Sequence, residues 1–95
     1  MPTVLSMDEI INAICLHLAE RKGVNVRDVQ VELSWDEDTG FTAEVLTQGR
    51  SQYLVASNIV EAVLRYLHTE YNIRAYPEDV RLELEDEIIA VVNEN

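Results

Sequence analysis

Two stretches of this chain carry the same helical pattern of apolar residues, and this repetition constrains the fold more than any other feature. In residues 57–71 the apolar positions share one sector of a helix when each residue turns about 100°. They are Ile59, Val60, Val63, Leu64 and Leu67. The N-terminal stretch repeats the pattern with Ile10, Ile11, Ile14, Cys15 and Leu18. The sequence therefore predicts two amphipathic helices, each with one face in the core.

The expected ends of these helices also recur. Ser6 followed by Glu9 predicts a capping box for the first helix. Asn58 followed by Glu61 predicts one for the second, with Ser57 as the other candidate cap. The expected C-terminal ends are residues that tolerate left-handed backbone, Gly23 and Asn72.

Alternation of apolar and polar residues after each helix predicts strands. The first strand points Val29, Val31, Leu33 and Trp35 toward the core, and a polar turn at 36–40 joins it to a strand over 41–47. Residues 50–54 follow the tight turn 48–49 and fit either a third strand or the start of the second helix. A later hairpin joins 80–84 to 88–92. The strand 88–92 is apolar on both faces, which predicts a place in the middle of a sheet or at a subunit interface.

The repetition extends beyond the helices, because residues 28–33 read like residues 79–84 after a two-residue shift. We therefore expect an internal α-β-β duplication and the order α-β-β-(β)-α-β-β in a single domain, residues 1–95. The predicted fold is α+β, a two-layer sandwich with two helices on one face of an antiparallel sheet. The opposite sheet face should carry Gln30, Glu32, Ser34, Thr42, Glu44, Leu46, Arg81 and Glu83.

Composition narrows the classes of function. A formal net charge of −11 argues against binding nucleic acid or an anionic membrane, since both require a cationic surface. The N-terminus lacks the pattern of a signal peptide, and no apolar run reaches the roughly 18 residues of a membrane span. A single cysteine cannot form an internal disulfide, which suits a reducing cytoplasm. A cytoplasmic protein is expected.

No motif predicts a catalytic, cofactor or metal site. The acidic loop from Asp36 lacks the glycine and glutamate of a calcium loop, since Phe41 and Thr47 stand in those places. The cluster Glu83, Glu85, Asp86 and Glu87 reads as a solvated hairpin end. Cys15 and His17 lie about 200° apart around a helix and cannot readily share one ion, and Cys15 reads as a small buried hydrophobe.

Four residues form the candidate functional surface. His17 and Tyr66 occupy equivalent positions of the two predicted helices, at the edge of the apolar stripe, where they serve either as boundary residues or as part of a ligand pocket between helices and sheet. Trp35 and Phe41 flank the first hairpin turn on the expected core face. They serve either as core residues or as anchors for a partner. His68 is expected on the solvated side of its helix.

Two resemblances add to this interpretation. The segment 49–56, Gly-Arg-Ser-Gln-Tyr-Leu-Val-Ala, and the α-β-β-β-α order over residues 6–71 resemble a double-stranded-RNA-binding domain. The lysines that hold phosphates in that family are replaced here by Gln52, Tyr53, Ala56 and Ser57, so the resemblance implies shape and not RNA binding. The segments 9–15, 40–45 and 49–55 are similar to a family of short uncharacterised proteins from Gram-positive spore-forming bacteria, which implies a small cytoplasmic protein with no established activity.

The leading hypothesis is a non-enzymatic protein-interaction or adaptor domain, most simply a homodimer, because symmetric dimers are the commonest oligomers. The alternative is a small-ligand or metal-binding protein, or a minor enzyme, that uses the pocket near His17. A remote alternative is an acidic mimic of nucleic acid that occupies a basic partner.

Overall fold

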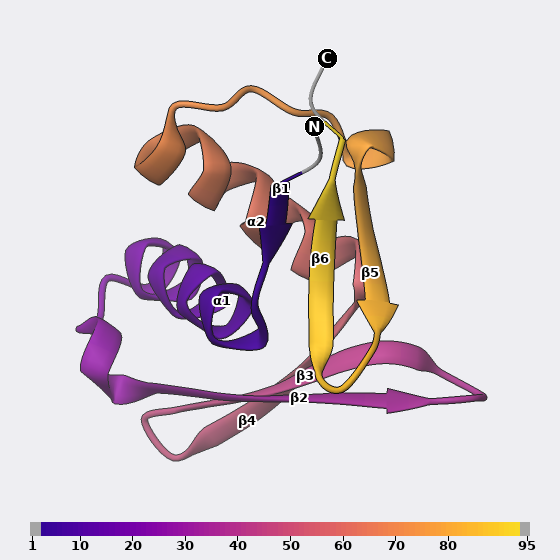
Figure 1. Ribbon diagram of the computed structural model, residues 1–95. Coiled ribbons are helices and arrows are strands. Elements are labelled where there is room, and N and C mark those ends of the chain that lie inside the picture. Colours follow the sequence, from indigo (N-terminus) through magenta and orange to yellow (C-terminus); the bar gives the residue numbers. More distant parts are fainter. Residues whose placement is uncertain (1–2, 94–95) are drawn as a thin grey trace.

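The computed structural model describes residues 3–93 (Figure 1). Their elements follow the order β1 (Thr3–Leu5), α1 (Met7–Lys22), η1 (Val26–Asp28), β2 (Val29–Asp36), β3 (Gly40–Thr47), β4 (Arg50–Val55), α2 (Ala56–Tyr71), η2 (Pro77–Asp79), β5 (Val80–Leu84) and β6 (Ile88–Val92). The two η elements are short 3-10 helices. Residues 50–55 are thus a strand, which resolves the choice that the sequence left open. The three-residue strand β1 has no counterpart among the predicted elements.

The strands form two antiparallel sheets, and the predicted single sheet is wrong. One sheet has the order β2-β3-β4, and the other has the order β1-β6-β5. The two hairpins do not pair with each other: β4, which follows directly along the chain, completes the first sheet, and the N-terminal β1 completes the second. β4 pairs with β3 from Thr42 opposite Val55 to Thr47 opposite Arg50. β1 pairs with β6, and Val4 lies opposite Val91. The α+β class and the two packed helices agree with the prediction.

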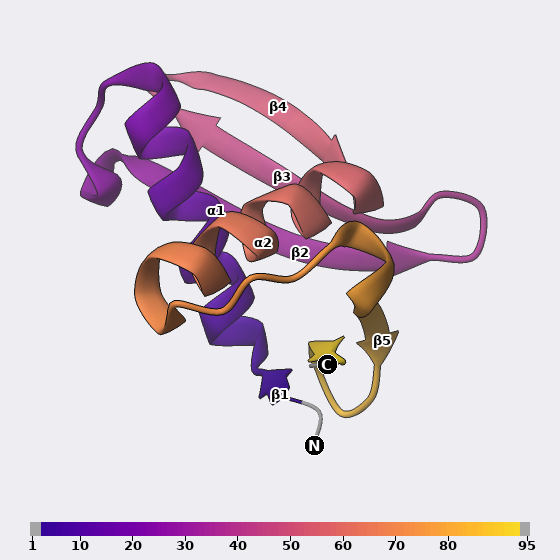
Figure 2. The same cartoon turned by 90° about the horizontal axis from the view of Figure 1, so that it is seen from above.

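The helix pair fills the angle between the two sheets. In Figure 1 both helices lie above β2, β3 and β4, while β5 and β6 stand beside them and run across the direction of β2. α1 contacts β2 and β6, and α2 contacts β3, β4 and β5. Figure 2 shows the same helix pair from above, crossing over the sheet β2-β3-β4. The core therefore lies where both sheets meet the inner faces of the helices.

The same order of elements occurs twice. A strand, a 16-residue helix, a short 3-10 helix and a hairpin make up residues 3–47, and the same series makes up residues 50–92. The strand that opens each half pairs with the last hairpin strand of the other half. α1 and α2 thus occupy equivalent places and contact each other between the two sheets. This arrangement supports the expected internal repeat and extends it to five elements in each half.

The helix ends are only partly as predicted. Ser6 caps α1: the Glu9 amide donates to the Ser6 Oγ at 3.3 Å, and the Ser6 amide donates to the Glu9 Oε1 at 3.5 Å. α2 begins earlier than expected, because β4 runs up to Val55, and Asn58 lies at its third position. The Asn58 Oδ1 accepts the Val55 amide at 3.2 Å, so neither Asn58 nor Ser57 is the N-cap. The left-handed ends at Gly23 and Asn72 are confirmed.

Burial follows the predicted alternation except at the ends of β2 and β5. Val29 and Leu33 are buried, but the Trp35 side chain is 44% exposed, so its predicted place in the core is wrong. Trp35 pairs with Phe41 near the turn of β2 and β3, which projects beyond the helices (Figure 1). Phe41 is half-buried and packs against the core. Leu84 is exposed for a similar reason, at the end of β5.

Candidate functional site

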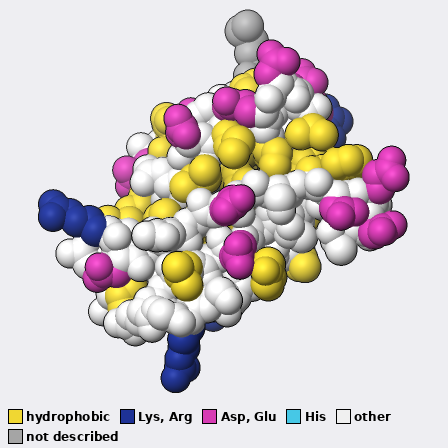
Figure 3. Space-filling view, turned by 90° about the horizontal axis from the view of Figure 1, so that it is seen from below, with side chains coloured by type: hydrophobic (Ala, Val, Ile, Leu, Met, Phe, Trp, Pro, Cys, Tyr) yellow, Lys and Arg dark blue, Asp and Glu magenta, His cyan; other side chains and the backbone are white. Residues whose placement is uncertain are grey.

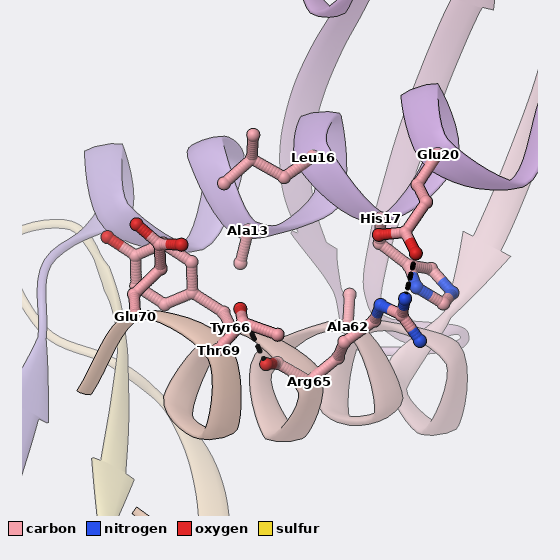
Figure 4. Close-up of a pocket in the computed structure, with 9 residues that line it drawn as sticks. All are labelled: Ala13, Leu16, His17, Glu20, Ala62, Arg65, Tyr66, Thr69 and Glu70. Carbon is pink, nitrogen blue, oxygen red and sulfur yellow. Dashed lines mark hydrogen bonds and ion pairs between the residues drawn. The ribbon is translucent and has the colours of Figure 1, made fainter. Parts of the chain in front are cut away.

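A groove of about 280 Å³ lies between α1 and α2 (Figure 4). Its walls come from the two helices alone, so it is not the predicted pocket between helices and sheet. α1 contributes residues at helical spacing, and α2 contributes residues at the same spacing together with Glu70. The lining residues are Ala13, Leu16, His17, Glu20, Ala62, Arg65, Tyr66, Thr69 and Glu70. Positions three and four apart share one helix face, which explains why one stripe of each helix lines the groove.

Equivalent positions of the two halves line this groove. Aligning the helix starts places Ala13 with Ala62, and both are fully buried because small side chains let the helices approach closely. His17 aligns with Tyr66, and the structure brings both predicted residues into the same groove (Figure 4). His17 is half-buried, whereas Tyr66 is buried. The groove therefore has alanine at one pair of equivalent positions, Ala13 and Ala62, and unlike residues at the other pair, His17 and Tyr66.

The environment of His17 favours the neutral imidazole. Its Nδ1 is shielded from solvent and has no hydrogen-bond partner among the described residues. Burial is the main cause that lowers the pKa of His17, and Arg21 and Arg65 lower it further. Glu61 and Glu20 act in the opposite direction. Burying a ring nitrogen without a partner costs less free energy when the ring is neutral than when the ring is charged.

Charged side chains close one end of the groove, and tyrosines lie at the other. Arg65 on α2 forms an ion pair with Glu20 on α1, both with exposed side chains. The rings of Tyr66 and Tyr71 meet edge to face with centroids 5.7 Å apart. The Tyr71 hydroxyl donates to Glu9 Oε2 at 2.7 Å, and this bond is the main cause that raises the pKa of Tyr71 to about 12. These contacts tie α2 to the start of α1.

The other predicted residues lie outside the groove. Trp35 and Phe41 sit at the end of the β2–β3 hairpin, and His68 is exposed. Cys15 is buried as expected, where its thiol points to the Val29 carbonyl at 3.6 Å and burial raises its pKa. A raised pKa keeps this sulfur as the unreactive thiol.

A second candidate surface is the outer face of the sheet β1-β6-β5. The inner face of β6 is buried through Ile88, Ala90 and Val92. On the outer face, Ile89 and Val91 are only half-buried, and Val4 opposite Val91 is 54% exposed. The sequence signal for this face was the strand 88–92, apolar on both sides, and the structure confirms its place in the middle of a sheet. Val4 gave no signal because β1 is too short to show alternation.

Arg81 and Glu83 border this apolar face on β5. The register places Arg81 opposite Val91 and Glu83 opposite Ile89, and the Arg81 Nε lies 2.7 Å from Glu83 Oε2. The sequence assigned these two side chains to the same face as Glu32 and Glu44, which is wrong because they lie on the other sheet. A cation and an anion thus stand side by side next to the apolar strip.

The outer face of β2-β3-β4 is different. Figure 3 views the molecule from this side and shows a band of hydrophobic side chains across the middle, separate hydrophobic groups among polar atoms below it, and acidic side chains gathered at one end. Leu46 is 42% exposed and Tyr53 70% exposed, while Glu44 lies between Glu32 and Tyr53 in the register. The Tyr53 hydroxyl donates to Glu44 at 3.0 Å, which raises the pKa of Tyr53. Carboxylates directly opposite each other repel, so this face favours water.

The described part of the chain offers few sites of other kinds. Within residues 3–93, no group of three or more His, Cys, Asp or Glu side chains could hold a metal ion. No helix in that range is long and apolar enough to cross a membrane. The acidic turn after β5 has a structural contact instead, since Glu87 Oε2 accepts the Met7 amide at 2.9 Å at the start of α1. An acid at this position also interacts favourably with the helix dipole.

Comparison with known proteins identifies the family. Residues 1–87 match the family described as a protein of unknown function (DUF2653). The chain is also 30% identical over 73 residues to the uncharacterized protein YxcD of Bacillus subtilis (strain 168), a match that covers 76% of this chain and 72% of that protein. No solved structure matches, so the resemblance of residues 6–71 to a double-stranded-RNA-binding domain stays a prediction. The predicted resemblance to short bacterial proteins is confirmed: the chain belongs to the DUF2653 family.

Proposed function

We propose that this protein is a non-enzymatic interaction domain that acts as a homodimer, with the outer face of β1-β6-β5 as its interface. The observation that carries the proposal is the apolar strip formed by Val4, Ile89 and Val91 on this face, where Val4 is exposed and the other two are half-buried. Removing such apolar side chains from water lowers the free energy by about 25 cal/mol per Å² of apolar surface buried. The outer face of the other sheet, β2-β3-β4, lacks such a strip because Glu32 and Glu44 interrupt its apolar residues.

The charges beside the strip favour a second copy as the partner. In a two-fold arrangement a patch on one copy meets the same patch on the other, and each contact occurs twice. Arg81 and Glu83 are neighbours on β5, so antiparallel packing of two strips brings Arg81 of each copy toward Glu83 of the other. A face that carries both signs of charge is complementary to itself. This local match offsets the repulsion between two chains of net charge −11, which salt screens within about 8 Å at physiological ionic strength.

Charge substitution on the two sheet faces tests this interface. Ile89→Lys places an ammonium group in the proposed contact, and we expect the dimer dissociation constant to rise by at least about 30-fold, as for a hot-spot residue. Leu46→Lys makes the same change on the outer face of the other sheet and serves as the matched control. Sedimentation equilibrium of both variants measures the effect. Equal dissociation constants for the wild-type protein and Ile89→Lys contradict the proposed face.

A second candidate function is small-ligand binding in the α1–α2 groove, which His17 and Tyr66 both line. The buried Nδ1 of His17, which has no hydrogen-bond partner among the described residues, favours it. The volume of about 280 Å³ lies at the small end of ligand pockets, so the ligand would be small. Native mass spectrometry of protein purified without chelator should then show a stoichiometric added mass that is lost in His17→Ala. A protein mass without any adduct, together with unchanged NMR spectra of the two proteins in cell extract, counts against a ligand.

A further inference from the structure

The two halves of this chain complete each other. The sheet β2-β3-β4 combines the hairpin of residues 29–47 with the first strand of the second half. The sheet β1-β6-β5 combines the hairpin of residues 80–92 with the first strand of the first half. Each half therefore donates one strand and receives one. The helices follow the same rule, since α1 contacts β6 of the second half and α2 contacts β3 of the first.

One tight turn joins the halves. Only Gln48 and Gly49 separate β3 from β4, and both have positive φ, 50° and 76°. Two positive φ values are characteristic of a type I′ hairpin turn, whose first position favours Asn, Asp or Gly. Gln48 is none of these, and a side chain of its size pays a steric cost in left-handed backbone. Short turns under strain are also where proteins exchange identical segments.

We propose that two copies of this chain exchange halves by opening at Gln48–Gly49, so that β4 of each copy pairs with β3 of the other. Every contact between halves is then kept, and only the turn changes, which releases Gln48 from its left-handed conformation. The loss of freedom on joining two chains opposes this gain, so the exchanged form gains population as protein concentration rises. Domain swapping of this kind is a low-cost route to a dimer.

In the exchanged dimer, each groove between α1 and α2 is formed by two chains. In the exchanged dimer, α1 of one copy packs on α2 of the other, so that each groove takes His17 from one chain and Tyr66 from its partner. The Arg65–Glu20 ion pair likewise becomes a contact between chains. Two complete grooves result, and a ligand bound there would touch both chains.

A disulfide across β3 and β4 reports which chain each strand belongs to. Leu46 lies opposite Ser51 in the register, and both side chains are exposed. Leu46→Cys and Ser51→Cys are combined with Cys15→Ala, which leaves no other thiol. The protein is refolded at low and at high concentration, oxidised after folding and run on a non-reducing gel. Closed chains give a disulfide within one chain, whereas exchanged chains give a covalently linked pair.

Turn variants sharpen the test. We expect linked pairs to increase with refolding concentration, to fall several-fold with Gln48→Gly, and to become the main product when Gln48 and Gly49 are deleted, because β3 and β4 then cannot reverse direction. The dimer proposed through the outer face of β1-β6-β5 keeps this disulfide within each chain and is lost with Ile89→Lys, so the two modes are distinguished. Disulfides within single chains alone at every concentration overturn the exchange, whether or not the deletion variant folds.

Discussion

His17 has a pKa below its ordinary value because burial removes water from a ring with no partner for Nδ1. The unfolded chain, with a histidine pKa of about 6.5, then binds a proton more readily than the folded chain. The stability that the neutral ring supplies is present above pH 6.5 or so and is lost as pH falls through the lower folded pKa. Arg21, Arg65, Glu20 and Glu61 set how far the pKa falls.

The substitution His17→Gln tests this dependence, since glutamine does not titrate. We expect the wild-type protein to lose more free energy of unfolding than the variant between about pH 7.5 and about pH 5. Urea unfolding followed by circular dichroism at several pH values gives the comparison. His68→Gln makes the same substitution on the exposed side of α2 and is the matched control. A steeper slope in His17→Gln than in the wild type would show that the ring is stabilised by its charge.

Helical periodicity predicted part of the candidate site at the level of single residues. It aligned His17 with Tyr66, and the groove contains both because equivalent faces of two packed helices meet. It failed for Trp35, whose alternation within β2 is regular but whose side chain lies beyond the end of the helices. Alternation gives the face of a side chain and carries no information on whether anything covers that face. The ion pair of Arg65 with Glu20 depends on the crossing of α1 and α2, which no local pattern records.

The capping box of α1 makes a prediction about a whole element. Ser6→Ala removes the oxygen that accepts the Glu9 amide, and we expect the free energy of unfolding to fall by about 1 kcal/mol. Ser57→Ala is the control, because Ser57 lies inside the first turn of α2 and caps nothing. Chemical denaturation of both variants measures the difference. A loss at Ser57 as large as the loss at Ser6 would contradict the observed start of α2.

Most elements could be predicted because their signals are local. Both helices, the two hairpins and the left-handed ends at Gly23 and Asn72 follow from periodicity and turn residues. The start of α2 could not, since residues 50–55 suit a strand or a helix and only pairing with β3 decides between them. β1 escaped prediction because three residues show no alternation, and its pairing with β6 joins opposite ends of the chain.

At the scale of the whole molecule, the sequence repeat predicted that two similar units exist but not how they combine. Two α-β-β units fit one continuous sheet, and they fit two separate sheets equally well. The choice depends on β1 and β4, which cross between halves and leave the two hairpins apart. This arrangement places β6 in the middle of its sheet and leaves Ile89 and Val91 half-buried on the outer face. The proposed interface is thus a consequence of how β1 and β4 pair across the two halves of one chain.

The mass of the native protein in solution tests the central claim most directly. Multi-angle light scattering across the micromolar range should give twice the chain mass of 10.8 kDa, with the same value at each concentration above the dissociation constant. A dimer through the apolar face predicts that Ile89→Lys returns the mass to that of one chain while Leu46→Lys does not. A wild-type mass of one chain throughout that range would contradict the account and leave the strip of Val4, Ile89 and Val91 without a self-partner.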